Sequence, residues 1–159
     1  MTQTMQISLT VNGEDVTANV PVRMNLVDFL RGELGLTGSH VGCEHGVCGA
    51  CTLDVDGATV RGCLMLAVQA DGTSVTTVEG LPQTGAAEEL RAAFTRHNAL
   101  QCGYCTPGML ATALEYVEQG GPADRAAIRE HLSGNYCRCT GYQSIVDAIC
   151  DVIEGRAEA

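Results

Sequence analysis

The sequence predicts an α+β protein in which a small mixed β-sheet packed on one helix is followed by a helical half. Three observations predict this fold class. Apolar and polar residues alternate with period two near the N-terminus, apolar stripes at helical spacing dominate after residue 88, and all but one of the nine cysteines fall into two groups of four, one in each half. A chain of 159 residues can hold one substantial core or two small ones, and the cysteine positions favour two.

The N-terminal segment predicts a β-hairpin. Residues 5–11 alternate between apolar and polar side chains and lead into Asn12-Gly13, a preferred pair for a tight hairpin turn. The second strand is expected at residues 15–20, where Pro21 ends it because proline cannot donate to the sheet.

The rest of the first half completes the sheet and supplies one helix. Residues 25–34 carry a one-sided apolar stripe, which predicts a short helix capped by Asn25 and ended by Gly35. Further strands are expected at residues 52–56, 58–61 and 75–78. The hairpin formed by the first two of these follows a cysteine-rich loop and should bring a later cysteine back to it.

A boundary between two domains is indicated at residues 79–87, where both periodicities stop. We expect a first domain over residues 1–80, a linker over 81–87 and a second domain over 88–159. Four helices are predicted in the second domain: residues 88–97, residues 107–118, a helix between Asp124 and Ser133, and residues 143–154. Pro107 suits a first turn, Asp124 suits an N-cap, and His97 is expected to act as a C-terminal cap.

The first cysteine group lies in and after the cysteine-rich loop. It comprises Cys43, Cys48, Cys51 and Cys63. Gaps of four, two and then eleven residues between successive cysteines match the ligands of a plant-type [2Fe–2S] cluster. Glycines at 42, 46 and 49 let the backbone come close to such a cluster. A zinc site or two disulfides are the alternatives, and His45 is expected to be a solvent-facing loop residue.

The second cysteine group lies in the helical half. It comprises Cys102, Cys105, Cys137 and Cys139. A CxxC pair and a CxC pair each precede a predicted helix, and a threonine follows the second cysteine of each, so two helix N-termini should direct their N–H groups at one anionic site. Taken alone, this spacing leaves structural zinc as an alternative. Cys150 falls in the apolar stripe of the last helix and is expected to be a buried thiol rather than a ligand.

Composition restricts the functions that are available. The formal net charge is −10, and no basic cluster is present that could neutralise phosphates, so nucleic acid is an unfavourable partner. No run of about eighteen apolar residues predicts a membrane span. The N-terminus carries no basic and apolar leader, so we expect a cytoplasmic chain. No arrangement of nucleophile and base, or of paired carboxylates, predicts catalysis by this chain alone.

Three motifs together resemble the two-[2Fe–2S] small subunit of the molybdenum hydroxylase (xanthine oxidase) family in its three-subunit bacterial form, which includes carbon monoxide dehydrogenase and the quinoline and nicotine oxidoreductases. They are GCEHGVCGACTLDVDG with Cys63, QCGYCTPGM at 101–109, and GNYCRCTGYQSIVDAI at 134–149. The resemblance implies a plant-ferredoxin-like β-grasp domain followed by a four-helix bundle, with each cysteine group holding one [2Fe–2S] cluster.

The resemblance also implies a role in electron transfer. Electrons would leave a molybdopterin centre in a large partner subunit, pass through the second cysteine group and then the first, and reach FAD in a medium partner subunit. Gln101 and Cys139 would lie against the pterin. The assembly would be a heterotrimer or a dimer of heterotrimers, with this chain as its non-catalytic iron–sulfur subunit. A free-standing ferredoxin-like electron carrier is the alternative function.

Overall fold

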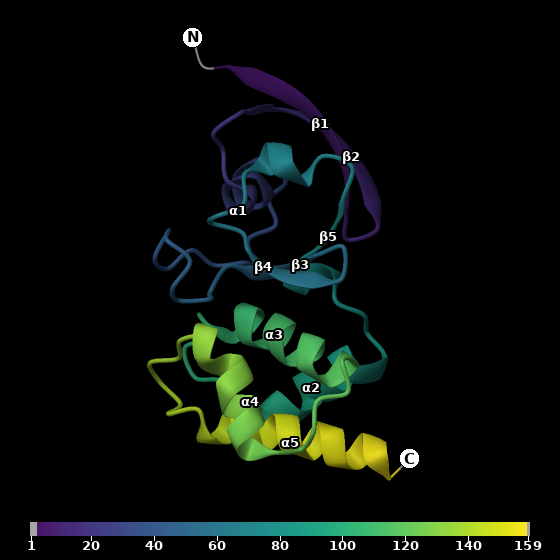
Figure 1. Ribbon diagram of the computed structural model, residues 1–159, viewed down its shortest axis with the longest axis vertical. Coiled ribbons are helices and arrows are strands. Elements are labelled where there is room, and N and C mark those ends of the chain that lie inside the picture. The colour runs from purple at the N-terminus through teal and green to yellow at the C-terminus, as the bar shows by residue number, and fades with distance from the viewer. Residues whose placement is uncertain (1–2, 159) are drawn as a thin grey trace.

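A computed structural model describes residues 3–158, with a β-sheet at one end of the molecule and helices at the other (Figure 1). The strands are β1 (Thr4–Val11), β2 (Glu14–Pro21), β3 (Thr52–Val55), β4 (Ala58–Arg61) and β5 (Ser74–Thr76). They form one sheet in the order β2-β1-β5-β3-β4, in which β1 and β5 are parallel and the other neighbours antiparallel. The predicted mixed sheet is therefore confirmed.

The helix expected at residues 25–34 is only partly α-helical. Asn25 caps it as predicted, because its side chain accepts a hydrogen bond of 2.8 Å from the Asp28 amide. The α-helical part, α1, covers only Leu26–Asp28, and Phe29–Glu33 form a wider π-helical turn in which the Leu34 amide bonds to the Phe29 carbonyl. The prediction of one regular helix was wrong on this point. The wider turn leaves Leu26, Phe29 and Leu30 fully buried against the sheet.

The last strand is shorter than the predicted 75–78. The Thr77 amide donates to Asn12 Oδ1 at 2.9 Å instead of joining the sheet, and Val78–Gly80 then form a 3₁₀ turn. The hairpin residue Asn12 therefore has a second role, because its side chain ends β5.

Four α-helices follow: α2 (Gly85–Arg96), α3 (Thr106–Glu118), α4 (Arg125–His131) and α5 (Gln143–Ala157). The predicted start at residue 88 was late by three residues, because Ala86 and Ala87 are buried and extend α2 backwards. Pro107 lies in the first turn of α3, and Asp124 caps α4 by accepting from the Ala127 amide at 2.8 Å, both as predicted. His97 is the C-cap of α2.

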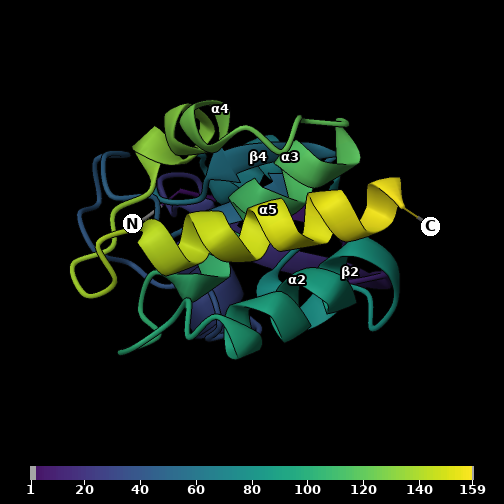
Figure 2. The ribbon, with the colours of Figure 1, turned by 90° about the horizontal axis from the view of Figure 1, so that it is seen from below.

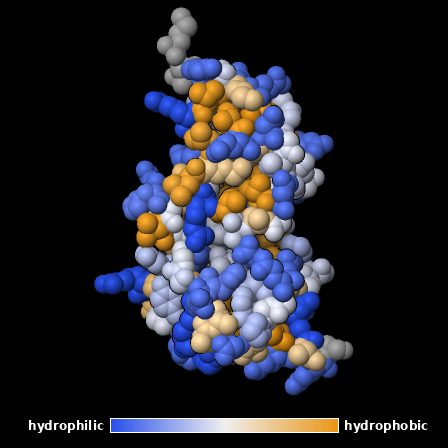
Figure 3. Space-filling view, viewed as in Figure 1, coloured by the Kyte–Doolittle hydropathy of each residue, from blue (hydrophilic) through white to orange (hydrophobic). Residues whose placement is uncertain are grey.

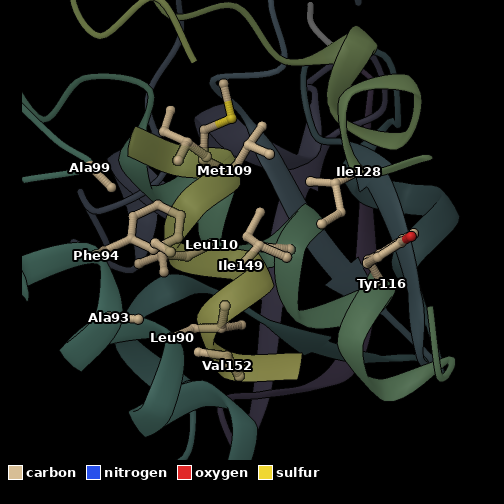
Figure 4. Packing of buried hydrophobic residues seen from close by; sticks show 14 of the residues in the cluster. Leu90, Ala93, Phe94, Ala99, Met109, Leu110, Tyr116, Ile128, Ile149 and Val152 are labelled. Atoms are coloured by element: carbon tan, nitrogen blue, oxygen red, sulfur yellow. The ribbon is translucent and has the colours of Figure 1, made fainter. Parts of the chain in front are cut away.

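The four helices share one hydrophobic core. Side chains from all four point into the same interior in Figure 4, among them Phe94 of α2, Met109 of α3, Ile128 of α4 and Ile149 of α5. Seen from below, α5 crosses the other helices on the side away from the sheet (Figure 2). This leaves α3 as the helix that faces the sheet (Figure 1). No helix within residues 3–158 has the length and apolar character that a membrane span requires.

Contacts along α3 hold the two halves together. Glu115 accepts two hydrogen bonds from Thr59 of β4, from the amide at 2.9 Å and from the hydroxyl at 3.0 Å. At the other end of α3, Gly108 lies so close to Gly49 that an ideal Cβ on Gly108 would be 2.1 Å from the Gly49 carbonyl oxygen. The N-terminal end of α3 therefore packs directly against the cysteine-rich loop of the first half.

Candidate functional site

The first cysteine group is assembled by a loop and a hairpin. Cys43 and Cys48 lie in the loop, and the Cys48 amide points at the Cys43 sulfur at 3.4 Å. Cys51 directly precedes β3 and Cys63 follows β4 by two residues. Because Thr52 pairs with Arg61 across this antiparallel hairpin, Cys63 returns to the side of Cys51, as the sequence predicts. The Cys63 thiol lies near enough to Cys51 to contribute, after burial, to raising the pKa of the Cys51 thiol.

The backbone of this loop is shaped around the sulfur atoms. Gly46 and Gly49 adopt φ angles of +79° and +74°, a left-handed conformation that favours glycine. An ideal Cβ on Gly42 would lie 3.1 Å from the Cys48 sulfur. Amides of Cys48 and His45 donate to Cys43 and lower the pKa of its thiol to about 6, whereas burial raises the pKa of Cys51 to about 11. The loop thus offers N–H donors to a thiolate, the form that binds metal.

The second cysteine group lies between the N-terminal ends of α3 and α5. The Cys102 and Cys139 residues are exposed and their sulfurs are 3.6 Å apart, while the half-buried Cys105 and Cys137 lie near enough to each other for Cys137 to help, after burial, to raise the pKa of the Cys105 thiol. Each contact joins one cysteine of the CxxC pair to one of the CxC pair. The two motifs therefore converge on one place, which agrees with the predicted meeting of two helix N-termini.

Thr140 supplies hydrogen-bond donors to this second group. Its hydroxyl lies 3.1 Å and its amide 3.4 Å from the Cys137 sulfur. Burial acts to raise the pKa of Cys137, but the Thr140 donors outweigh it and the pKa is lowered. The pKa of Cys105 is instead raised to about 12, with burial as the largest cause. The two half-buried thiols of this group therefore have different surroundings.

The donor sets fit two-iron clusters. All nine cysteines are free thiols, and the thiols of each group meet in pairs. A [2Fe–2S] cluster needs four cysteines spread over two irons, so paired thiols beside a glycine-lined loop suit it.

Sequence reasoning did not find the contacts that join the two cysteine groups. The Tyr136 amide donates to the Cys48 carbonyl at 2.8 Å, which links a residue of the first group to the neighbour of Cys137. Tyr104 reaches from the CxxC loop to the first group, where its hydroxyl donates to Val41 O at 2.7 Å and its ring stacks on His40 at 4.6 Å. The two groups therefore lie side by side.

Arg61 places a positive charge at the same junction. Its guanidinium donates to Gly134 O at 2.8 Å, to Asn135 Oδ1 at 3.0 Å and to the Thr52 hydroxyl. Thr52 is the neighbour of Cys51, and Asn135 lies fully buried two residues before Cys137. One cation therefore contacts residues next to both groups. No spacing rule in the sequence indicates this role, because the partners are 9 and 74 residues away.

The remaining candidate residues occupy distinct places. Gln101 is exposed, and its Nε2 donates to the Cys139 carbonyl at 3.1 Å, so it ties the CxxC loop to the CxC loop. Cys150 is buried in the core of the helical half, as expected. His45 is exposed on the first loop, as expected. The His97 ring contacts Asp151 of α5 at 3.1 Å.

Comparison with known proteins gives two family models that together cover most of the chain. Residues 9–74 match the 2Fe-2S iron-sulfur cluster binding domain, and residues 77–150 match the [2Fe-2S] binding domain. The chain is 55% identical over 151 residues to the caffeine dehydrogenase subunit gamma of Pseudomonas sp. (strain CBB1), covering 92% of this chain and 89% of that protein. It is 52% identical over 147 residues to the nicotine 6-hydroxylase small subunit of Paenarthrobacter nicotinovorans, covering 92% and 88%.

A solved structure shares the whole fold. A chain of quinoline 2-oxidoreductase from Pseudomonas putida 86 superposes with a TM-score of 0.89 at 52% identity, covering 99% of this chain and 98% of that one. At this coverage, the likeness extends to both halves of the chain.

Proposed function

Because the chain belongs to the family of electron-transfer subunits with two [2Fe–2S] domains that serve molybdenum hydroxylase complexes, we propose that each group of four cysteines ligates one cluster. The first cluster is held by Cys43, Cys48, Cys51 and Cys63, and the second by Cys102, Cys105, Cys137 and Cys139. The observations that carry this assignment are the Cys48 amide on the Cys43 sulfur in the first group and the 3.6 Å approach of the Cys102 and Cys139 sulfurs in the second. Each cluster, when bound, accepts and releases one electron at a time.

The residues around the thiols hold the two centres close and favour their negative charge. Backbone amides of the first loop and the Thr140 side chain donate to sulfur. The Arg61 cation contacts residues next to both groups, and a positive charge there favours the negative charge that each centre gains on reduction. The Tyr136 amide bond to Cys48 O fixes one group against the other. These contacts support a relay rather than two independent carriers.

We also propose how the chain faces its partner subunits. Within the described residues 3–158, all but one of the exposed large apolar side chains flank cysteine motifs: Val47 and Leu64 in the first group, and Leu100, Tyr104 and Tyr136 in the second. On the face shown in Figure 3, hydrophobic surface forms separate patches rather than one continuous area. Such exposed patches indicate protein contacts. The second group then meets the large molybdopterin subunit and the first group the medium FAD subunit, in a heterotrimer or a dimer of heterotrimers.

Three finer assignments complete the proposal. The relatives named for caffeine, nicotine and quinoline all concern nitrogen heterocycles, so we propose a nitrogen heterocycle as the substrate of the whole complex.

The cytoplasm is the proposed compartment, because nine free cysteines suit its reducing conditions. The sheet with its helical segment belongs to a plant-ferredoxin-like β-grasp domain over residues 1–80. The helices α2–α5 form the four-helix bundle of a second domain, which begins with α2 at Gly85 rather than at residue 88 and runs to residue 159.

The proposal is tested by metal content and spectroscopy of the natively purified protein. We expect about four irons and about four acid-labile sulfides per chain, and two distinguishable paramagnetic signals after reduction. We also expect co-migration with flavin- and molybdenum-containing chains in size-exclusion chromatography. Zinc in place of iron, or a single signal, contradicts the ligand assignment. An iron-loaded chain that migrates alone indicates the free-standing carrier instead.

Gln101 is proposed to contact the pterin, with its exposed amide beside Cys139. Gln101→Ala is expected to keep both clusters but to slow reduction of the chain by substrate severalfold, because the amide offers donors and an acceptor to a heterocycle edge. Gln119→Ala, at the opposite end of α3, is the matched control and should reduce at the wild-type rate. Rapid-mixing absorbance of the complex measures both rates. Equal rates in the two variants contradict the pterin contact.

A further inference from the structure

Thr106 carries a buried hydroxyl that has no hydrogen-bond partner within residues 3–158, a property shared there only with Ser39. Thr106 directly follows Cys105 and is the first residue of α3. Its amide already donates to Gly103 O at 3.2 Å, so the hydroxyl is the group left unpaired. A buried hydroxyl without a partner destabilises the folded protein. Because Thr106 is the sequence neighbour of Cys105, the second cysteine group adjoins it and can supply the missing acceptor.

Thr140 shows what a threonine in this position does. It follows Cys139 as Thr106 follows Cys105, and its hydroxyl donates to the Cys137 sulfur at 3.1 Å. Its amide lies 3.4 Å from the same sulfur. The N-terminal end of α3 has one donor fewer, because Pro107 carries no N–H. The hydroxyl of Thr106 is the side-chain donor that remains at that end.

We propose that the Thr106 hydroxyl donates a hydrogen bond to a sulfur of the second [2Fe–2S] cluster and thereby raises its reduction potential. The inference rests on the proposed ligation by Cys102, Cys105, Cys137 and Cys139. Reduction adds one electron, and hence one negative charge, at the iron–sulfur centre, and no proton leaves the hydroxyl. A donor to sulfur stabilises the more negative state, so its removal lowers the potential.

The test is a redox titration of the assembled complex, followed by electron paramagnetic resonance. Thr106→Val keeps the side-chain shape without the hydroxyl. It is expected to make reduction of the second cluster about tenfold less favourable, which is about 59 mV for one electron. Thr106→Ser should keep the wild-type potential, and Thr140→Val should lower it. The potential of the first cluster is the internal reference and should not move.

Ser39→Ala is the matched control, because it removes the other unpaired buried hydroxyl. It should leave the potential of the second cluster unchanged. A readout without the cluster is urea unfolding of the iron-free chain, in which Thr106→Val should be at least as stable as wild type because the hydroxyl has no protein partner there.

The outcomes separate this inference from the proposed function. A wild-type protein without a second iron–sulfur signal contradicts the ligation itself. Two normal clusters with the same potential in Thr106→Val and wild type, or an equal shift in Ser39→Ala, overturn the hydrogen bond alone. If Thr106→Val does not assemble the second cluster, Thr106→Ser and Thr106→Ala are compared. A lower potential in the alanine variant supports the bond, and equal potentials overturn it.

Discussion

Gly108→Ala is expected to destabilise the protein by more than about 3 kcal/mol, although alanine is normally the better residue in a helix. An ideal Cβ at Gly108 would lie 2.1 Å from the carbonyl oxygen of Gly49 and 3.2 Å from its carbonyl carbon. Both contacts are with backbone, so no side-chain rotation relieves them. Either α3 or the first cysteine loop must move.

Gly155→Ala is the matched control for this substitution. Gly155 also lies within a helix, α5, but its ideal Cβ meets nothing within 4 Å. The control should be neutral or more stable by up to about 1 kcal/mol, because alanine has the higher helix propensity. Urea unfolding measures both variants. A Gly108→Ala protein that unfolds at the wild-type urea concentration contradicts the close packing of α3 on the loop.

Gly108→Ala is also expected to change the distance between the two cysteine groups, because it displaces the first cysteine loop. Gly49 lies between Cys48 and Cys51 in the chain. An ideal Cβ on Gly49 would lie 2.6 Å from the Gly134 carbonyl oxygen, near the second group. Movement at this point changes the separation of the two groups. Magnetic interaction between the reduced clusters should therefore weaken in Gly108→Ala and remain unchanged in Gly155→Ala.

Local signals in the sequence predicted most elements, because each depends on a few neighbouring residues. The Asn12-Gly13 turn, Pro107 in a first turn and the Asp124 cap all lie where expected. The π-helical turn at Phe29–Glu33 was missed because packing against the sheet, rather than propensity, decides its wider hydrogen bonds. The early start of α2 also depends on burial, here of Ala86 and Ala87.

The sequence also predicted one part of the candidate site, the two cysteine groups, but not the junction between them. Cysteine spacing predicted which thiols meet, and the structure brings each group together, while their role as ligands stays a prediction. The junction of Arg61, Asn135 and Tyr104 left no signal, because its contacts between the two halves join residues 63 or more positions apart and follow no periodicity. Only the relative placement of the two halves could reveal it.

Cys105→Ser is expected to remove one cluster, and Cys150→Ser to remove none. Cys105 is half-buried against Cys137, and serine is a poor substitute for a thiolate ligand because its hydroxyl stays protonated. We therefore expect Cys105→Ser to contain about two irons per chain instead of about four, with only one paramagnetic signal remaining. Iron analysis and electron paramagnetic resonance of the purified complex measure both quantities.

Cys150→Ser tests whether the ninth cysteine is excluded from the ligands, as the assignment requires. Cys150 is buried in the core of the helical half, and burial raises the pKa of its thiol. A serine hydroxyl there should cost about 1–3 kcal/mol of stability but leave all the iron in place. Cys105→Ser is therefore expected to lose iron, whereas Cys150→Ser is expected to lose stability and keep its iron. Loss of a cluster in Cys150→Ser, with full iron in Cys105→Ser, would mean that the ninth cysteine is a ligand and Cys105 is not.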